Sequence, residues 1–177
     1  MKNAILKNGK EITIRKAKKE DAQAMINFYN LVGGETDFLS FSKDEFKIPL
    51  KDYEESIEST NQQNNSIILL ALNGNKIISI ASIESTYKEK GKHVGTFGIV
   101  ISKDFWGLGL GTELMDCLIN WAKSNGVTKK INLVTNENNP TAIKLYEKFG
   151  FEKEGILRKE SFNDGVYNDL IAMGLLI

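Results

Sequence analysis

The sequence predicts a single α/β domain over residues 1–177, with a mixed sheet and helices on both faces of that sheet. Segments with an alternating apolar pattern, typical of strands, are interspersed with segments that have a helical apolar period. Turn sequences rich in asparagine, aspartate and glycine separate several of them. The chain length is also within the range of one domain that buries most of its surface.

The first half of the chain is predicted to hold strands and helices around one hairpin. Asn73-Gly74-Asn75 is a strong hairpin turn, because asparagine and glycine tolerate the positive φ angles that such turns need. Gly33 to Ile48 has no clean period, and Asn61 to Asn65 is expected to be an exposed polar loop. The predicted elements are a strand Glu11–Arg15, a helix Asp21–Leu31, a helix Pro49–Thr60 that begins at its proline, and strands Ser66–Leu72, Lys76–Thr86 and His93–Ser102.

The second half begins with a glycine-rich turn and ends in a hairpin. Asn163-Asp164-Gly165 is the turn of that closing hairpin. The predicted elements are a helix Leu110–Ser124, a strand Lys130–Thr135, a helix that begins at Asn139, and strands Glu152–Phe162 and Val166–Leu176.

The glycine-rich turn, Phe105 to Thr112, is the most informative stretch of the chain. Its three alternating glycines lie between an apolar strand and an amphipathic helix. Glycine lets a phosphate approach the backbone, and the first N–H groups and the dipole of a helix favour bound negative charge. The turn lacks the Gly-Lys-Ser/Thr ending of a P-loop, and Thr112 stands where a dinucleotide fingerprint has its third glycine. It therefore predicts another kind of anion site, with tight helix packing as the structural alternative.

A second motif runs from Asn139 to Phe151. Pro140 near its start and Gly150 at its end predict a short helix. Asn139 and Tyr146 share one face of this helix, about 10 Å apart along its axis. Their structural interpretations are an N-cap and a core aromatic residue.

Together, in this order and about thirty residues apart, the two motifs resemble those of the GNAT N-acetyltransferase superfamily. In that family an Arg/Gln-x-x-Gly-x-Gly/Ala loop wraps the acetyl-CoA pyrophosphate, and an Asn-x-x-Ala-x-x-Leu-Tyr-x-x-x-Gly-Phe segment follows. Trp106 stands where this loop usually begins with Arg or Gln, and in this the chain is similar to the branch that includes ribosomal-protein N-terminal acetyltransferases and their small-molecule-acetylating relatives. The resemblance implies a GNAT-like domain with a mostly antiparallel sheet and a splayed central pair of strands. The second motif matches at Asn139, Ala142, Leu145, Tyr146, Gly150 and Phe151.

The resemblance also implies the chemistry of the site. Acetyl-CoA would be the co-substrate, and its acetyl group would pass directly to a primary amine in a ternary complex. The strand before the loop would pair with the pantetheine amides as an added strand does, and one of its N–H groups would stabilise the developing oxyanion. Tyr146 would hydrogen-bond or protonate the leaving thiolate. The implied cofactor-binding residues are Ile99, Val100, Ile101, Gly107, Leu108, Gly109, Leu110, Gly111, Thr112 and Asn139.

Two parts of the implied site are open in the sequence. An amine with a pKa of about 10.4 is protonated at neutral pH, so a base has to remove a proton. Glu84 is the first candidate for this second catalytic role; Glu35, Asp37 and Glu160 are others, and solvated surface carboxylates are the alternative for each. The residues from Trp106 to Thr112 carry no positive charge, so Lys103 or Lys144 would assist the backbone in phosphate binding.

Composition narrows the partners. Acidic and basic residues balance at 23 each, so neither nucleic acid nor an anionic membrane is an expected partner, and a cytoplasmic location is expected. One cysteine, Cys117, and one histidine, His93, provide neither an internal disulfide nor a metal site. Cys117 is expected to be a buried structural thiol.

The acceptor stays open between a small-molecule amine and a protein N-terminus, and a homodimer is expected only by analogy with the family. Two other classes of function remain. A non-catalytic acyl-CoA-binding or sensing module would not need the hydroxyl of Tyr146. A structural or partner-binding protein on the same fold would not need the open glycine loop.

Overall fold

A computed structural model describes all 177 residues. Its strands are β1 (Lys2–Ile5), β2 (Glu11–Lys16), β3 (Ile67–Asn73), β4 (Lys76–Ser85), β5 (Val94–Ile101), β6 (Lys130–Asn136), β7 (Glu152–Asn163) and β8 (Val166–Leu176). Its helices are α1 (Ala22–Val32), α2 (Leu50–Gln62), α3 (Leu110–Ser124) and α4 (Pro140–Lys148), with the short 3-10 turns η1 (Lys19–Asp21) and η2 (Lys103–Phe105).

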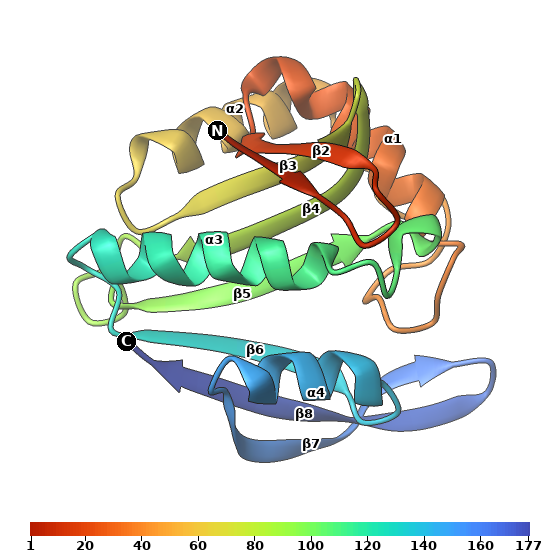
Figure 1. Ribbon diagram of the computed structural model, residues 1–177. Coiled ribbons are helices and arrows are strands. Elements are labelled where there is room, and N and C mark those ends of the chain that lie inside the picture. Colours follow the sequence, from red (N-terminus) through yellow and green to blue (C-terminus); the bar gives the residue numbers. More distant parts are fainter.

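The eight strands form one sheet in the order β1-β2-β3-β4-β5-β6-β8-β7 (Figure 1). Six of the seven neighbouring pairs are antiparallel, and β5 and β6 are parallel. The predicted α/β fold with a mixed, mostly antiparallel sheet is confirmed.

Helices cover both faces of this sheet, because strand side chains alternate between the faces and each face carries apolar residues. The larger core, of 24 buried residues, lies against α3 and α4; it includes Phe97 of β5, and Ile99 and Ile101 pack against it. The smaller core, of 12 buried residues, lies against α1 and α2, and Val100 packs against it. Successive residues of β5 therefore face opposite layers.

The centre of the sheet is split. β5 and β6 pair only from Val94 to Thr96, whose partners are Lys130 to Asn132. Beyond these three pairs β5 and β6 diverge and leave an opening between them. Helices α3 and α4 lie on either side of this opening (Figure 1). The splayed central pair is thus confirmed, and the turn that leads from β5 into α3 lies at its open end.

Three local expectations need correction. The sequence predicts no strand or helix before Glu11, but Lys2–Ile5 forms edge strand β1, which pairs with β2. The polar stretch Asn61 to Asn65 is not a fully exposed loop. Asn65 is buried because its Nδ2 donates to the carbonyls of Thr86 at 3.2 Å and Lys92 at 2.9 Å. Cys117 is half-buried rather than buried, and desolvation raises the pKa of its thiol.

None of the helices has both the length and the apolar character needed to span a membrane.

Candidate active site

The three glycines of the loop have different roles. Gly107 and Gly109 have φ angles of +71° and +92°, in the region that favours glycine, and Gly109 is the N-cap of α3. Gly111 has an ordinary φ, but a Cβ there would come within 3.0 Å of a methyl group of Leu145 on α4. Tight packing therefore explains Gly111, whereas backbone conformation explains Gly107 and Gly109.

The loop presents free backbone donors. The six consecutive N–H groups from Gly107 to Thr112 donate to no acceptor in the protein, and the first turn-closing bond of α3 runs from Glu113 to the carbonyl of Gly109. A Cβ at Gly107 would meet nothing within 4 Å, so the backbone there is open to a ligand. Free donors at the positive end of a helix dipole fit a diphosphate such as that of acetyl-CoA.

Sequence reasoning missed a cation at this loop. The backbone N–H of Lys7 donates to the carbonyl of Leu108 at 3.1 Å. The Lys7 side chain lies beside Gly109, with methylene carbons 3.9 and 4.0 Å from where a Cβ would be. Lys7 belongs to the turn between β1 and β2, so only tertiary structure brings it here. The available signal was the Asn8-Gly9 dipeptide, a hairpin turn that would have predicted β1 and placed a lysine at the turn.

The backbone of β5 divides its groups between β4 and the opening. Ser102 N–H donates to the opposite carbonyl of Ile78 at 3.0 Å, so in this antiparallel pair every second residue turns its backbone groups to β4. Val100 is one of these, and its carbonyl also accepts a bond of 2.7 Å from the hydroxyl of Ser79. The expectation that the Val100 backbone binds pantetheine is therefore wrong, because it points away from the opening.

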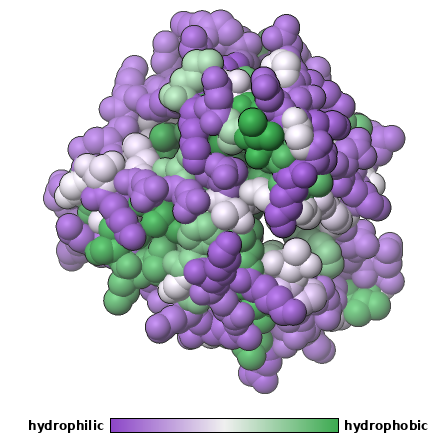
Figure 2. All heavy atoms as spheres, viewed as in Figure 1, coloured by the Kyte–Doolittle hydropathy of each residue, from purple (hydrophilic) through white to green (hydrophobic).

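Ile99 and Ile101 turn their backbone groups toward the opening by the same alternation. The carbonyl of Ile101 already accepts a hydrogen bond of 2.7 Å from the indole Nε1 of Trp106. This bond ties the glycine loop to the end of β5, and it leaves the N–H of Ile101 and both groups of Ile99 for a ligand. Figure 2, in the same view as Figure 1, shows the surface hollowed in the region between α3 and α4.

Tyr146 and Asn139 lie on α4, beside the opening. The Tyr146 ring is buried against Phe97, at 5.9 Å between centroids, and against Phe151, at 6.0 Å. Its hydroxyl bonds to no protein group, and burial alone raises the pKa of Tyr146 to about 12. Asn139 Oδ1 caps α4 by accepting from Ala142 N–H at 3.1 Å, so the N-cap interpretation is confirmed. The Nδ2 of Asn139 remains as a donor.

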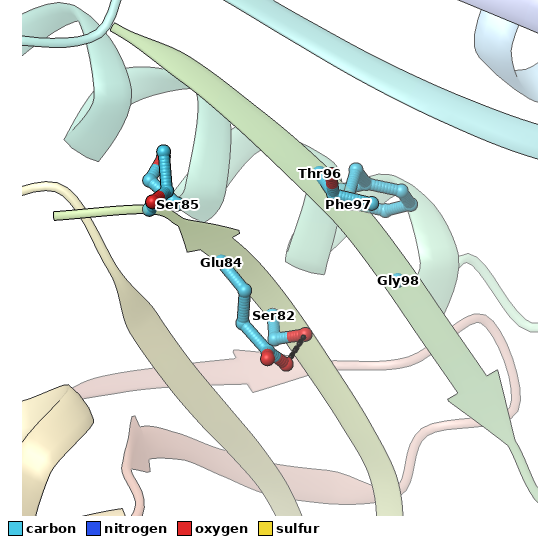
Figure 3. Close-up of a pocket in the computed structure, with 7 residues that line it drawn as sticks. Ser82, Glu84, Ser85, Thr96, Phe97 and Gly98 are labelled. Carbon is cyan, nitrogen blue, oxygen red and sulfur yellow. Dashed lines mark hydrogen bonds between the residues drawn. The ribbon is translucent and has the colours of Figure 1, made fainter. Parts of the chain in front are cut away.

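Glu84 approaches the same segment of β5 from the other face of the sheet. It lies on β4 opposite Thr96, and its Oε1 accepts a hydrogen bond of 3.0 Å from Ser82 (Figure 3). Its side chain borders an open pocket of about 480 Å³ between β4 and β5 that also includes Phe97. Phe97 contacts Tyr146, so the two predicted catalytic residues flank one short stretch of β5.

The other carboxylates proposed as bases lie elsewhere. The Glu35 carboxylate accepts from Lys103 N–H at 2.7 Å and from the Ser102 hydroxyl at 3.4 Å, so it anchors the 33–48 segment to η2. Asp37 is exposed, and Glu160 is exposed on β7 at the far edge of the sheet. Glu84 alone among the four shares a pocket with Phe97, the residue of β5 that contacts Tyr146.

This fold and site define a class of protein that binds a phosphate-bearing cosubstrate across a split sheet, and comparison with known proteins identifies the family. Residues 35–151 match the model of the Acetyltransferase (GNAT) family. The chain belongs to this family, and the family predicted from the two motifs is confirmed.

Two curated relatives illustrate the range of the family. The chain is 29% identical over 109 residues to the L-amino acid N-acetyltransferase AaaT of Escherichia coli (strain K12), covering 59% of this chain and 65% of that protein. It is 34% identical over 77 residues to spermidine N(1)-acetyltransferase of the same organism, covering 44% and 41%. The matched region thus spans about two fifths to two thirds of these relatives.

Solved structures extend the likeness over nearly the whole chain. A GNAT-family acetyltransferase from Streptococcus pneumoniae is 33% identical with a TM-score of 0.90, covering 94% of this chain and 99% of that one. The yncA protein of Salmonella typhimurium, whose structure holds its cofactor acetyl-CoA, is 20% identical with a TM-score of 0.79 and 93% coverage of each chain. A ribosomal-protein-alanine N-acetyltransferase from Brucella melitensis is 23% identical with a TM-score of 0.78, covering 93% and 98%. The last two likenesses concern the fold alone.

Proposed function

We propose that this protein transfers the acetyl group of acetyl-CoA directly to a primary amine in a ternary complex. The observation that carries the proposal is the run of six free N–H groups from Gly107 to Thr112 at the N-terminus of α3, at the open end of a split sheet. Membership of the GNAT family supports acetyl-CoA as the ligand of this loop.

The residues around the opening divide the binding of acetyl-CoA among them. The loop N–H groups, the dipole of α3 and the ammonium group of Lys7 hold the diphosphate. The backbone of Ile99 pairs with the pantetheine amides as a neighbouring strand would, and Asn139 Nδ2 donates to the same arm. Acetyl-CoA supplies a reactive thioester, which this arrangement directs toward Phe97.

Glu84 acts on the acceptor side of β5. A primary ammonium group has no lone pair with which to attack, and its pKa of about 10.4 keeps it protonated at neutral pH. The exposed Glu84 carboxylate, held by Ser82, removes that proton directly or through a water molecule. An N–H of β5 that points into the opening, that of Ile99, donates to the carbonyl oxygen as negative charge develops there.

Tyr146 stabilises the leaving thiolate by a hydrogen bond rather than by full proton transfer. Its pKa of about 12 exceeds that of an ordinary thiol, about 8.5, so complete transfer to a thiolate would be uphill by about 5 kcal/mol. A short hydrogen bond needs no such transfer, and the Tyr146 hydroxyl has no protein partner to give up.

The acceptor is a primary amine of a small molecule or of a protein N-terminus. Relatives named for L-amino acids and for spermidine support small amines. Trp106 in place of the usual Arg or Gln supports the branch that includes the ribosomal-protein enzymes.

A free-thiol release assay tests the proposal. Purified protein and acetyl-CoA are mixed with polyamines, amino acids, aminoglycosides and short peptides with free N-termini, and the acetylated product is identified by mass spectrometry. Amine-dependent thiol release with a matching product is expected. Binding of acetyl-CoA in calorimetry without any acetylated product would instead support a non-catalytic acyl-CoA sensor, and absence of binding would refute the loop assignment.

A further inference from the structure

The pocket beside Glu84 is lined by one acidic residue and by no basic residue. Its lining includes the hydroxyl residues Ser82, Ser85, Thr86 and Thr96, and Glu84 is its only charged residue (Figure 3). Ser82 occupies Oε1 of that carboxylate, which leaves Oε2 free to accept from a ligand. The lining therefore offers a charged partner for an ammonium group and no charged partner for a carboxylate.

A further acceptor lies on β6, next to β5 and outside the residues that line this pocket. Asn132 is the residue of β6 that pairs with Thr96, at the last pair before the two strands separate. Its neighbours Ile131 and Leu133 belong to the core against α3 and α4, so its side chain lies on the same face of the sheet as Glu84. The Oδ1 atom of Asn132 is buried and has no donor in the protein. An ammonium group carries three donors, which suits the free Oε2 of Glu84 and the hydroxyl oxygens of the pocket lining.

The helices over this face add aromatic side chains. Tyr29 of α1 packs on Phe46 with 4.4 Å between ring centroids, and Phe46 packs on Tyr53 of α2 at 5.5 Å. Burial is the largest cause of the raised pKa of both tyrosines, and the nearby negative charge of Glu84 adds to it. Aromatic rings near a carboxylate attract a cation, and none of these side chains carries a positive charge that would neutralise an anion.

We infer that the acceptor is a cationic amine that carries no carboxylate next to the reacting nitrogen, such as an alkylamine or polyamine. A free α-amino acid would bring its carboxylate to the side of Glu84, with no cation in the pocket lining to neutralise it. This inference rests on the proposed function. It narrows the acceptor from primary amines in general to amines without a carboxylate next to the reacting nitrogen.

A matched set of three amines isolates the effect of the carboxylate. L-norvaline and n-butylamine differ only by the carboxylate, and L-norvalinamide replaces the carboxylate with a neutral group of nearly equal size. The kcat/KM for each is measured with acetyl-CoA by product formation in mass spectrometry, and the Kd of each is measured by calorimetry on CoA-saturated protein. We expect n-butylamine and L-norvalinamide to exceed L-norvaline by at least tenfold in kcat/KM and in affinity.

Substitutions at the pocket test the same point from the protein side. Thr86→Arg adds a cation to the lining and is expected to narrow the gap between n-butylamine and L-norvaline at least threefold, whereas Thr86→Gln, which adds length without charge, leaves it unchanged. Glu84→Gln is expected to weaken n-butylamine binding about tenfold on CoA-saturated protein.

The outcomes separate the inference from the proposed function. Equal or better use of L-norvaline would overturn the inference and leave acetyl transfer intact. Failure of all three amines to bind to CoA-saturated protein would also overturn it. Failure of the acetyl-CoA assay with every amine of the broad panel would refute the proposed function, whereas selective binding of n-butylamine would still support the charge selectivity of the pocket.

Discussion

Replacing Tyr146 with phenylalanine removes one hydroxyl group from a buried ring. Because that hydroxyl bonds to no protein group and the ring packing against Phe97 and Phe151 is kept, we expect the free energy of unfolding to change by about 0.5 kcal/mol or less. The affinity for acetyl-CoA should also stay nearly constant. The variant therefore separates a chemical role from a structural one.

The expected loss is in turnover. If Tyr146 donates a hydrogen bond to the departing thiolate, its removal should lower kcat about a hundredfold, or about 2.7 kcal/mol of barrier, as for other donors that act only in the transition state. Thiol release at saturating acetyl-CoA and amine measures kcat, calorimetry measures CoA affinity, and thermal unfolding measures stability. A kcat within twofold of the wild type would refute the role of Tyr146, and a large loss of stability would refute the account of its packing.

Three further predictions concern the loop and the tyrosine. Lys7→Ala should weaken CoA binding about fivefold, about 1 kcal/mol, and the effect should be smaller at high salt. Lys10→Ala is the matched control, because the Lys10 ammonium group lies 4.9 Å from the centroid of the Phe105 ring. Equal effects of the two variants on CoA affinity in calorimetry would contradict the placement of Lys7 at the loop. Gly107→Ala should strain the loop by about 1 kcal/mol and weaken CoA binding. Gly111→Ala should mainly lower the melting temperature, since its Cβ would crowd Leu145. A melting temperature unchanged by Gly111→Ala would contradict the packing role of Gly111. Stability should fall as the pH rises from about 10 to 12, because unfolded tyrosines ionise near 10 whereas burial raises the folded pKa of Tyr146 to about 12 and also raises those of Tyr29 and Tyr53. The share of Tyr146 is about 2.7 kcal/mol, so Tyr146→Phe should make the decline in denaturant titrations shallower without abolishing it.

The sequence was most informative where function is performed by backbone in a local motif. The free N–H groups from Gly107 to Thr112 could be predicted, because unpaired donors at a helix start depend only on neighbouring residues. The N-cap role of Asn139 is local in the same way. The distinct role of Gly111 could not be seen, since it depends on Leu145, a residue of another helix.

Predictions that depended on strand register or on contacts between distant residues were wrong or missed a residue. Val100 was expected to face the pantetheine, but which residues of β5 face β4 is fixed only by the pairing of Ser102 with Ile78. Lys7 was missed because the β1–β2 turn meets the loop only in the folded protein. Among the acidic candidates for the base, Glu35 and Glu84 look alike in the sequence. Only the structure distinguishes Glu35, which anchors η2, from Glu84, which borders the pocket between β4 and β5.

The split between β5 and β6 gives the sheet two edges in its interior, where most sheets have continuous pairing. Such edges expose backbone groups to any extended chain, and in this protein the proposed partner is the pantetheine arm rather than another polypeptide. A ligand that binds only the folded state stabilises it by RT ln(1 + [L]/Kd), about 2.7 kcal/mol at a concentration of a hundred times Kd. If the pantetheine arm pairs with β5 as proposed, it fills the interior edge of the sheet, and the resistance of the protein to unfolding should follow the supply of acetyl-CoA.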